Sequence, residues 1–146
     1  MVNPVDNFLD KKYAFDQFIQ EINNHNMRGI VSMISKDVKM YSTESGLSKG
    51  IENVTKFFLD MFKSFPNFFL DPIFIIRTYS PCKIVMSEVK MGGLQTGVFA
   101  GNPPNSKYFL IHGVLITCFD MSDKIKDIRL HYDSRSIYKQ LRILKV

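Results

Sequence analysis

The stretch LQTGVFAGNPPNSKYFLIHGVLITCFDMSDKIKDIRLHYD, residues 94–133, decides the fold of this chain. Residues 107–119 and 125–133 are typical of two neighbouring strands, and residues 120–124 between them supply turn-forming side chains. Side chains alternate between the two faces of a strand, so each strand divides into two rows. That division indicates which polar groups can share a pocket.

Both rows of the first strand are largely apolar. One row contains Tyr108, Leu110, His112, Val114, Ile116 and Cys118, and the other contains Phe109, Ile111, Gly113, Leu115, Thr117 and Phe119. An antiparallel sheet with one face in water alternates more cleanly between apolar and polar residues. We therefore expect this strand to be covered on both faces.

The second strand carries its polar residues in one row. That row contains Ile125, Asp127, Arg129, His131 and Asp133, and the other contains Lys126, Ile128, Leu130 and Tyr132. An acid, a histidine and an arginine at every second position point in the same direction. The row is either the solvent face of the sheet or the polar end of a cavity.

Length and composition indicate one globular domain, residues 1–146, with enough apolar material for a sizeable core. Phe is frequent, with 13 residues, and Trp is absent, which suits either a cavity for an apolar ligand or an ordinary Phe-rich core. The net charge is +5, but the basic residues are spread along the chain rather than clustered. Nucleic-acid binding needs a basic patch or a recognised motif, so we expect no nucleic-acid partner.

The two cysteines, Cys82 and Cys118, have no second Cys or His at metal-ligand spacing, so no metal site is expected. Each is more typical of a small buried apolar residue. The N-terminus lacks the pattern of a signal peptide, and nowhere do eighteen apolar residues occur together. These features predict a soluble, cytoplasmic protein with no membrane partner.

The remaining elements follow from hydrophobic periodicity, and their order predicts an α+β fold with helices on one face of a curved sheet. No internal repeat interrupts this order. The expected elements are helices over residues 5–24, 27–34, 51–65 and 134–144, further strands over 37–41, 68–79 and 83–91, and a loop over 42–50.

Five short motifs carry a resemblance to a known family: Gly50, SFPN at 64–67, GVFAGNPPNSK at 97–107, DKIKDIRLHYD at 123–133 and QL at 140–141. In this order and spacing they resemble the SnoaL-like polyketide cyclases of the nuclear transport factor 2-like superfamily, which also contains ketosteroid isomerase and scytalone dehydratase. The resemblance implies a cone in which a curved mixed or antiparallel sheet wraps around the helices and leaves a deep apolar pocket. It also implies a homodimer formed through the outer face of the sheet.

The resemblance further implies a function without cofactors. Family members use a pocket Asp for acid/base chemistry in an intramolecular aldol closure, and Asp133 after Tyr132 best matches that position. Such chemistry needs a carboxyl group whose pKa is tuned by burial. We therefore expect aldol cyclisation, isomerisation or dehydration of a small apolar carbonyl compound. Gln95 stands where many relatives carry histidine, which favours the alternative of a non-catalytic ligand-binding or protein-interaction module.

The expected catalytic residues are Asp133, as the acid/base, and His112. The expected substrate-binding residues are Gln95, Arg129, His131, Tyr41, Tyr108, Phe58 and Phe62. Other interpretations stay open at this point. Asp133 precedes a helix and suits an N-cap, and His112 suits a core position. Arg129 and His131 suit a solvated edge of the sheet.

Overall fold

The computed structural model describes the backbone of residues 4–143 and the side chains of residues 14–143. The α+β class expected from the sequence is confirmed. Within the described residues the elements are α1 (Pro4–Asn23), α2 (Met27–Ser32), β1 (Ile34–Ser42), β2 (Gly46–Lys49), α3 (Ile51–Ser64), β3 (Phe69–Thr78), β4 (Lys83–Leu94), β5 (Tyr108–Phe119), β6 (Ile125–Tyr132) and α4 (Ser134–Leu141). Strand β2 lies inside the segment that we expected to be a loop, because a four-residue strand carries too little alternation to be recognised. None of the helices in this range is long and apolar enough to cross a membrane.

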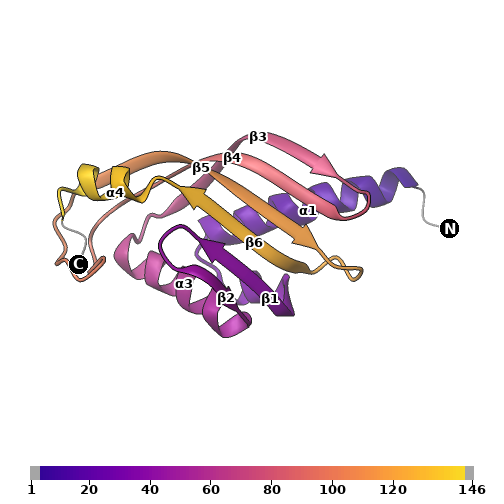
Figure 1. The fold of residues 1–146 in the computed structure, drawn as a ribbon, viewed down its shortest axis with the longest axis horizontal. Helices are drawn as coiled ribbons and strands as arrows, with labels where there is room; N and C mark the ends of the chain where they lie inside the picture. The colour runs from indigo at the N-terminus through magenta and orange to yellow at the C-terminus, as the bar shows by residue number, and fades with distance from the viewer. Residues whose placement is uncertain (1–3, 144–146) are drawn as a thin grey trace.

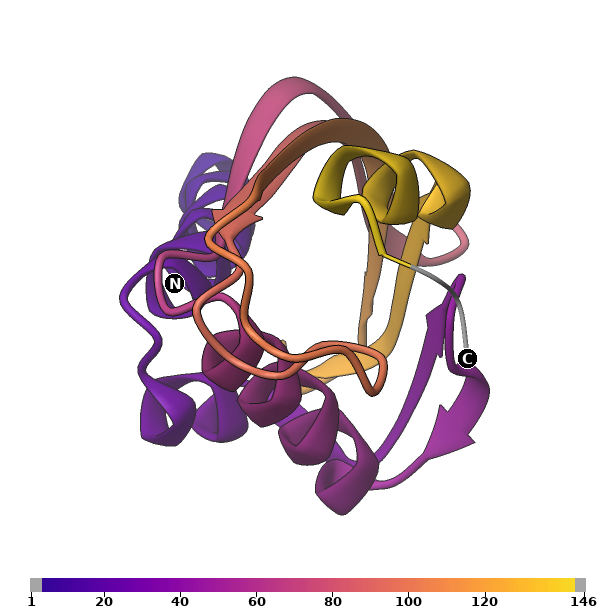
Figure 2. The same ribbon diagram turned by 90° about the vertical axis from the view of Figure 1, so that its left-hand side faces the viewer.

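The six strands form one mixed sheet in the order β2-β1-β6-β5-β4-β3. Only β1 and β6 pair in parallel, and the other neighbours are antiparallel. The sheet is strongly curved and does not close on itself (Figure 1). Figure 2 shows the strands bending around the interior, with α1 and α3 on the side that the sheet leaves open. This arrangement agrees with the expected cone.

The concave face of the sheet carries the core, and the convex face is exposed. On β5 the row that contains Phe109, Ile111 and Leu115 is buried, whereas Tyr108 and Leu110 of the other row are each 46% exposed. The expectation that β5 is covered on both faces is therefore wrong for the single chain. The helices pack only inside the curve, so the second row faces outward although it is apolar.

Strand β6 shows which of its rows faces the interior. Ile128, Leu130 and Tyr132 point inward, and Arg129 and His131 are exposed on the convex face. Of the two interpretations of the polar row, the solvent face is the one that the structure has. A register shift between β5 and β6 near Phe119 also turns Ile125 inward, out of step with the rest of its row.

Helix α3 closes the interior with the apolar stripe that its sequence predicts. Val54, Phe58 and Met61 are buried, and Phe58 meets Phe18 of α1 edge to face at 6.3 Å between ring centroids. Aromatic pairs in this geometry add to the stability that burial provides. At the end of the helix, Phe65 is fully buried and contacts Phe109 of β5 at 4.9 Å. These aromatic contacts fix α3 against the sheet. Other residues of α3 line the pocket described next.

Candidate functional site

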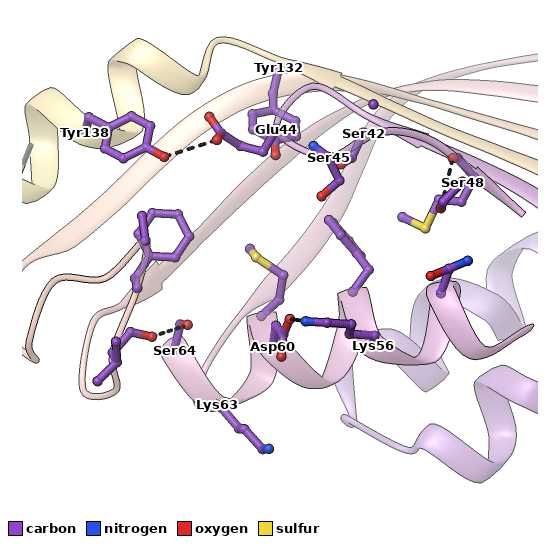
Figure 3. A pocket seen from close by; sticks show the side chains of 18 residues that line it. Ser42, Glu44, Ser45, Ser48, Lys56, Asp60, Lys63, Ser64, Tyr132 and Tyr138 are labelled. Carbon is purple, nitrogen blue, oxygen red and sulfur yellow. Dashed lines mark hydrogen bonds and ion pairs between the residues drawn. The ribbon is translucent and has the colours of Figure 1, made fainter. Parts of the chain in front are cut away.

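A pocket of about 680 Å³ lies at the end of the sheet where β1 and β6 finish. Its walls come from the β1–β2 hairpin, α3, the loop between β4 and β5, the last residue of β6 and α4 (Figure 3). The size falls within the range of ordinary small-molecule sites. The lining residues are Met40, Ser42, Glu44, Ser45, Gly46, Ser48, Asn53, Lys56, Phe57, Asp60, Met61, Lys63, Ser64, Val98, Phe99, Ala100, Tyr132 and Tyr138.

One carboxylate and two phenols form the polar end of this pocket. The Tyr138 hydroxyl donates a hydrogen bond to Oε2 of Glu44 at 3.1 Å. The other oxygen, Oε1, is shielded from solvent and has no hydrogen-bond partner among the described residues. Tyr132 lies on the other side of Glu44, so that the carboxylate stands between the two rings (Figure 3). A buried carboxylate oxygen without a partner is costly, which marks Glu44 as a candidate functional group.

Strand pairing brings these three side chains together from distant parts of the chain. Tyr41 pairs with Arg129 and Ser42 with Leu130, so the turn after β1 reaches the end of β6. The Tyr132 amide donates to Oγ1 of Thr43 at 3.0 Å, which fixes Glu44, the next residue of the turn, beside Tyr132. Tyr138 comes from the middle of α4.

Both phenols remain protonated at neutral pH. Burial, and then the negative charge of Glu44, raise the pKa of Tyr132 and that of Tyr138 each to about 12. For Tyr132, hydrogen bonds from the Glu44 backbone and the Ser42 side chain act in the opposite direction and favour the ionised form. Such bonds are donated to the phenol oxygen.

The raised phenol pKa values predict an alkaline loss of stability. A group whose folded pKa lies above its unfolded value stabilises the fold below the unfolded pKa, here 10.0, and that contribution is lost as the pH rises toward 12. We expect the free energy of unfolding to fall over this interval. Urea unfolding at successive pH values, together with ultraviolet titration of the phenolates, measures it. In Tyr132→Phe the fall should be smaller, and an equal fall would contradict the assignment.

The opposite wall of the pocket is mainly apolar. Phe57 and Met61 of α3 and Phe99 of the β4–β5 loop line it. At its outer edge, Lys56 and Asp60 form an ion pair at 2.6 Å, with both side chains mostly exposed. Exposed pairs of this kind contribute little stability. The pocket therefore has one polar end at Glu44, apolar walls and a solvated rim.

Gln95 holds the β4–β5 loop in place. Its side chain is fully buried, and Nε2 donates toward the carbonyl oxygens of Gly97 at 3.1 Å, Asn102 at 3.3 Å and Pro103 at 3.1 Å. Gln95 does not line the pocket, although the loop that it organises does so through Val98, Phe99 and Ala100. We expected Gln95 to bind substrate, and the structure instead places it behind the pocket wall.

Asp133 does not face the pocket. Its side chain is exposed and accepts hydrogen bonds from the backbone amides of Arg135 and Ser136, as the N-cap of α4. The placement expected from the resemblance is corrected here, and the N-cap interpretation is the one that the geometry supports. The residue before it, Tyr132, is the one that points inward, because neighbouring residues of a strand face opposite sides.

The capping role of Asp133 makes a simple prediction. Asp133→Ala should lower the free energy of unfolding by about 0.5–2 kcal/mol, because two amides of α4 lose their acceptor. Asp133→Asn keeps an acceptor and should change stability less. Urea denaturation of both variants measures the difference. Equal stability of wild type and Asp133→Ala would contradict the capping role.

The two histidines and the arginine expected in the site lie on the convex face. His112 is exposed, and its Nδ1 is 3.0 Å from Oε1 of Glu88. Arg129 forms an exposed pair with Asp127 at 3.3 Å. His131 packs against Tyr41, with 4.7 Å between the ring centroids. The sheet therefore separates these four predicted residues, His112, Arg129, His131 and Tyr41, from the pocket.

The aromatic residues expected in the site are also elsewhere. Tyr108 is exposed on the convex side of β5. Phe58 is part of the core, and Phe62 stacks on His25 at 3.9 Å between ring centroids. None of the residues predicted from the sequence to form the site lines the pocket. Among the described side chains, no three His, Cys, Asp or Glu residues gather as metal ligands.

The comparisons identify the family. The model of the SnoaL-like polyketide cyclase family matches residues 14–141, which is most of the chain. This protein therefore belongs to the SnoaL-like polyketide cyclase family. None of the curated proteins matches it.

Solved structures share the fold at low sequence identity. The chain is similar to AclR from Streptomyces galilaeus, named as a "putative hydroxylase", with a TM-score of 0.79, 20% identity and coverage of 94% of this chain and 84% of that one. It is also similar to a "putative polyketide cyclase" from Xanthomonas campestris pv. campestris, with a TM-score of 0.80, 14% identity and coverage of 90% of this chain and 96% of that one. IdmH from Streptomyces antibioticus is also named as a "putative polyketide cyclase". Its TM-score with this chain is 0.76 at 13% identity, and the match covers 91% of this chain and 99% of that one.

Proposed function

We propose that this protein is a small-molecule enzyme that performs acid/base catalysis on an apolar carbonyl compound, with Glu44 as the acid/base and no cofactor. The observation that supports the proposal is the buried, unpartnered Oε1 of Glu44 beside two protonated phenols. Membership of the SnoaL-like family supports the class of reaction, and the names of AclR and IdmH are consistent with work on small molecules. In this proposal Glu44 takes the role that the family resemblance implied for Asp133.

The arrangement suggests a sequence of proton transfers. The Glu44 carboxylate removes a proton from the carbon next to a substrate carbonyl. The electron pair of that C–H bond forms a carbon–carbon double bond, and the π pair of the carbonyl moves to its oxygen. The Tyr132 hydroxyl donates a hydrogen bond to this oxygen as its negative charge develops. The protonated Glu44 then returns the proton to another atom of the substrate. If the returned proton goes to an alkoxide formed by carbon–carbon bond closure, the result is an aldol cyclisation; return to another carbon gives isomerisation.

Tyr138 has a positioning role in this proposal. Its hydrogen bond to Oε2 fixes the orientation of the carboxylate at the polar end of the pocket. Phe99 in turn lies against the Tyr138 ring, with centroids 6.0 Å apart. The loop organised by Gln95 thus supports the catalytic carboxylate through Phe99 and Tyr138.

Exchange of carbon-bound protons tests the proposal without knowledge of the natural substrate. A panel of cyclic ketones and 1,3-diketones is incubated with the protein in heavy water, and deuterium uptake next to the carbonyl is followed by NMR. We expect uptake above the buffer rate for at least one compound, and loss of that excess in Glu44→Gln. Binding of these compounds without exchange would contradict the enzyme and favour the non-catalytic binding module.

We also propose that the convex face of the sheet forms a homodimer, as the family resemblance implies. Apolar side chains are exposed across three neighbouring strands on this face, at Phe74 and Ile76, Met86, and Leu110 and Val114. Glu88, which pairs with both Phe74 and Val114, lies among them. Exposed apolar side chains gathered on one face are typical of interaction surfaces.

A substitution that introduces one charged side chain on the convex face tests the dimer. Phe74→Asp should convert a dimer of wild-type chains to monomers in sedimentation experiments, because an unpaired carboxylate resists burial. Met121→Asp is the matched control, since Met121 is 93% exposed in the β5–β6 turn. A monomeric wild type at micromolar concentration would contradict the dimer.

A further inference from the structure

The two cysteines of the chain lie next to each other at the end of the sheet away from the pocket. Cys82 comes one residue before β4, and Cys118 is the last residue but one of β5. Ile84 of β4 pairs with Cys118, and Lys83 pairs with Phe119. Cys82 lies in the bend directly before Lys83, so it is a diagonal neighbour of Cys118. The two thiols are close enough to share a hydrogen bond.

The surroundings give the two thiols different properties. Cys82 is exposed and lines a hollow of about 300 Å³ together with Lys83, Phe119 and Lys126. Cys118 is partly buried. Burial is the main cause that raises the pKa of Cys118, the charge of Lys126 lowers it, and the hydrogen bond with Cys82 raises it further. Because Cys82 is exposed and Cys118 is partly buried, Cys82 is the thiol that an incoming reagent meets first.

We propose that Cys82 and Cys118 are a reversible redox pair that forms an intramolecular disulfide on reaction with a low-molecular-weight disulfide. The Cys82 thiolate attacks one sulfur of the reagent, and the first small thiol leaves with the proton that Cys82 has lost. The Cys118 thiolate then attacks the Cys82 sulfur of this mixed disulfide and displaces the second small thiol. In total, two protein thiols and one small disulfide give one protein disulfide and two small thiols.

The bond would join the start of β4 to the end of β5 without touching the pocket. Closing the loop of residues 82–118 restricts the unfolded chain, so the oxidised protein should melt several degrees higher than the reduced one. The pocket lies beside Tyr132 at the far end of β6, whereas Cys118 lies near Ile125 at its start. We therefore expect ligand binding in the pocket to stay unchanged, which separates this test from that of the proposed function.

Oxidised glutathione is the probe, applied to the reduced, folded full chain at neutral pH. The proposal expects no free thiols, a mass lower by two hydrogen atoms, and one peptide pair linked through Cys82 and Cys118, all reversed by dithiothreitol. In Cys118→Ser the mixed disulfide at Cys82 should accumulate, and Cys82→Ser should react far more slowly. The proposal is overturned if wild type keeps both thiols, carries glutathione without an internal link, or forms only links between chains.

Discussion

Replacing Glu44 by glutamine should lower the rate of proton transfer by about 10²–10⁴-fold and leave the fold intact. The amide keeps an oxygen for the hydrogen bond from Tyr138, so the local geometry survives. What is lost is the negative charge and the ability to accept and return a proton. Ligand affinity should change far less than turnover, because the pocket walls are the same in both proteins.

The same variant has a readout that needs no substrate. The charge of Glu44 is the second cause, after burial, of the raised pKa of both Tyr132 and Tyr138. In Glu44→Gln both phenols should therefore titrate at lower pH than in wild type, as followed by ultraviolet absorbance. Glu52→Gln is the matched control, since Glu52 is exposed in the first turn of α3 and lies outside the pocket. Unchanged phenol titration in Glu44→Gln would show that the carboxylate does not stand between the two rings.

The sequence predicted the elements and the family well, because both depend on local patterns. Apolar periodicity predicts α3 from the spacing of Val54, Phe58 and Met61, and those residues are buried as expected. Alternation also divides residues 127–132 of β6 into the correct rows, and Ile125 departs from its row at the register shift. It does not say which row faces inward, since that depends on where the helices pack. The resemblance pointed to Asp133, and the local pattern leaves open whether its row or the row of Tyr132 faces inward.

Glu44 could not be predicted because its environment is made by long-range pairing. In the sequence it is one acid among the turn formers of residues 42–50. Its place in the pocket follows from the parallel pairing of β1 with β6, which joins positions as far apart as Tyr41 and Arg129. No short motif encodes such a pairing. The available signal was weaker: Tyr132 continues the inward row of Ile128 and Leu130, so a polar partner for its hydroxyl had to come from another strand.

The second large effect is expected from Gln95→Glu. The glutamine amide donates toward three carbonyl oxygens inside the β4–β5 loop, and its own Oε1 is buried without a partner. A glutamate of the same shape brings only acceptors to those carbonyls when it is ionised. We expect a loss of about 3–5 kcal/mol in the free energy of unfolding at neutral pH, which is typical of an uncompensated buried charge.

The pH dependence of this loss distinguishes its cause. Burial and the facing carbonyls favour the protonated acid, so the folded protein holds the proton more tightly than the unfolded chain. The penalty is therefore small below the unfolded pKa of glutamate and grows as the pH rises from there through the folded pKa. Urea unfolding at several pH values measures it, with Gln17→Glu on the exposed side of α1 as the matched control.

The same variant should also impair the pocket, because the loop supplies Phe99 to its wall and Phe99 contacts Tyr138. Weaker ligand binding is expected at a pH where Gln95→Glu is still folded, and it should recover as the pH is lowered and the acid is protonated. Gln17→Glu should show neither effect. If Gln95→Glu matches wild type in stability and in binding at neutral pH, Gln95 does not hold the loop, and the support of Glu44 through Phe99 and Tyr138 loses its basis.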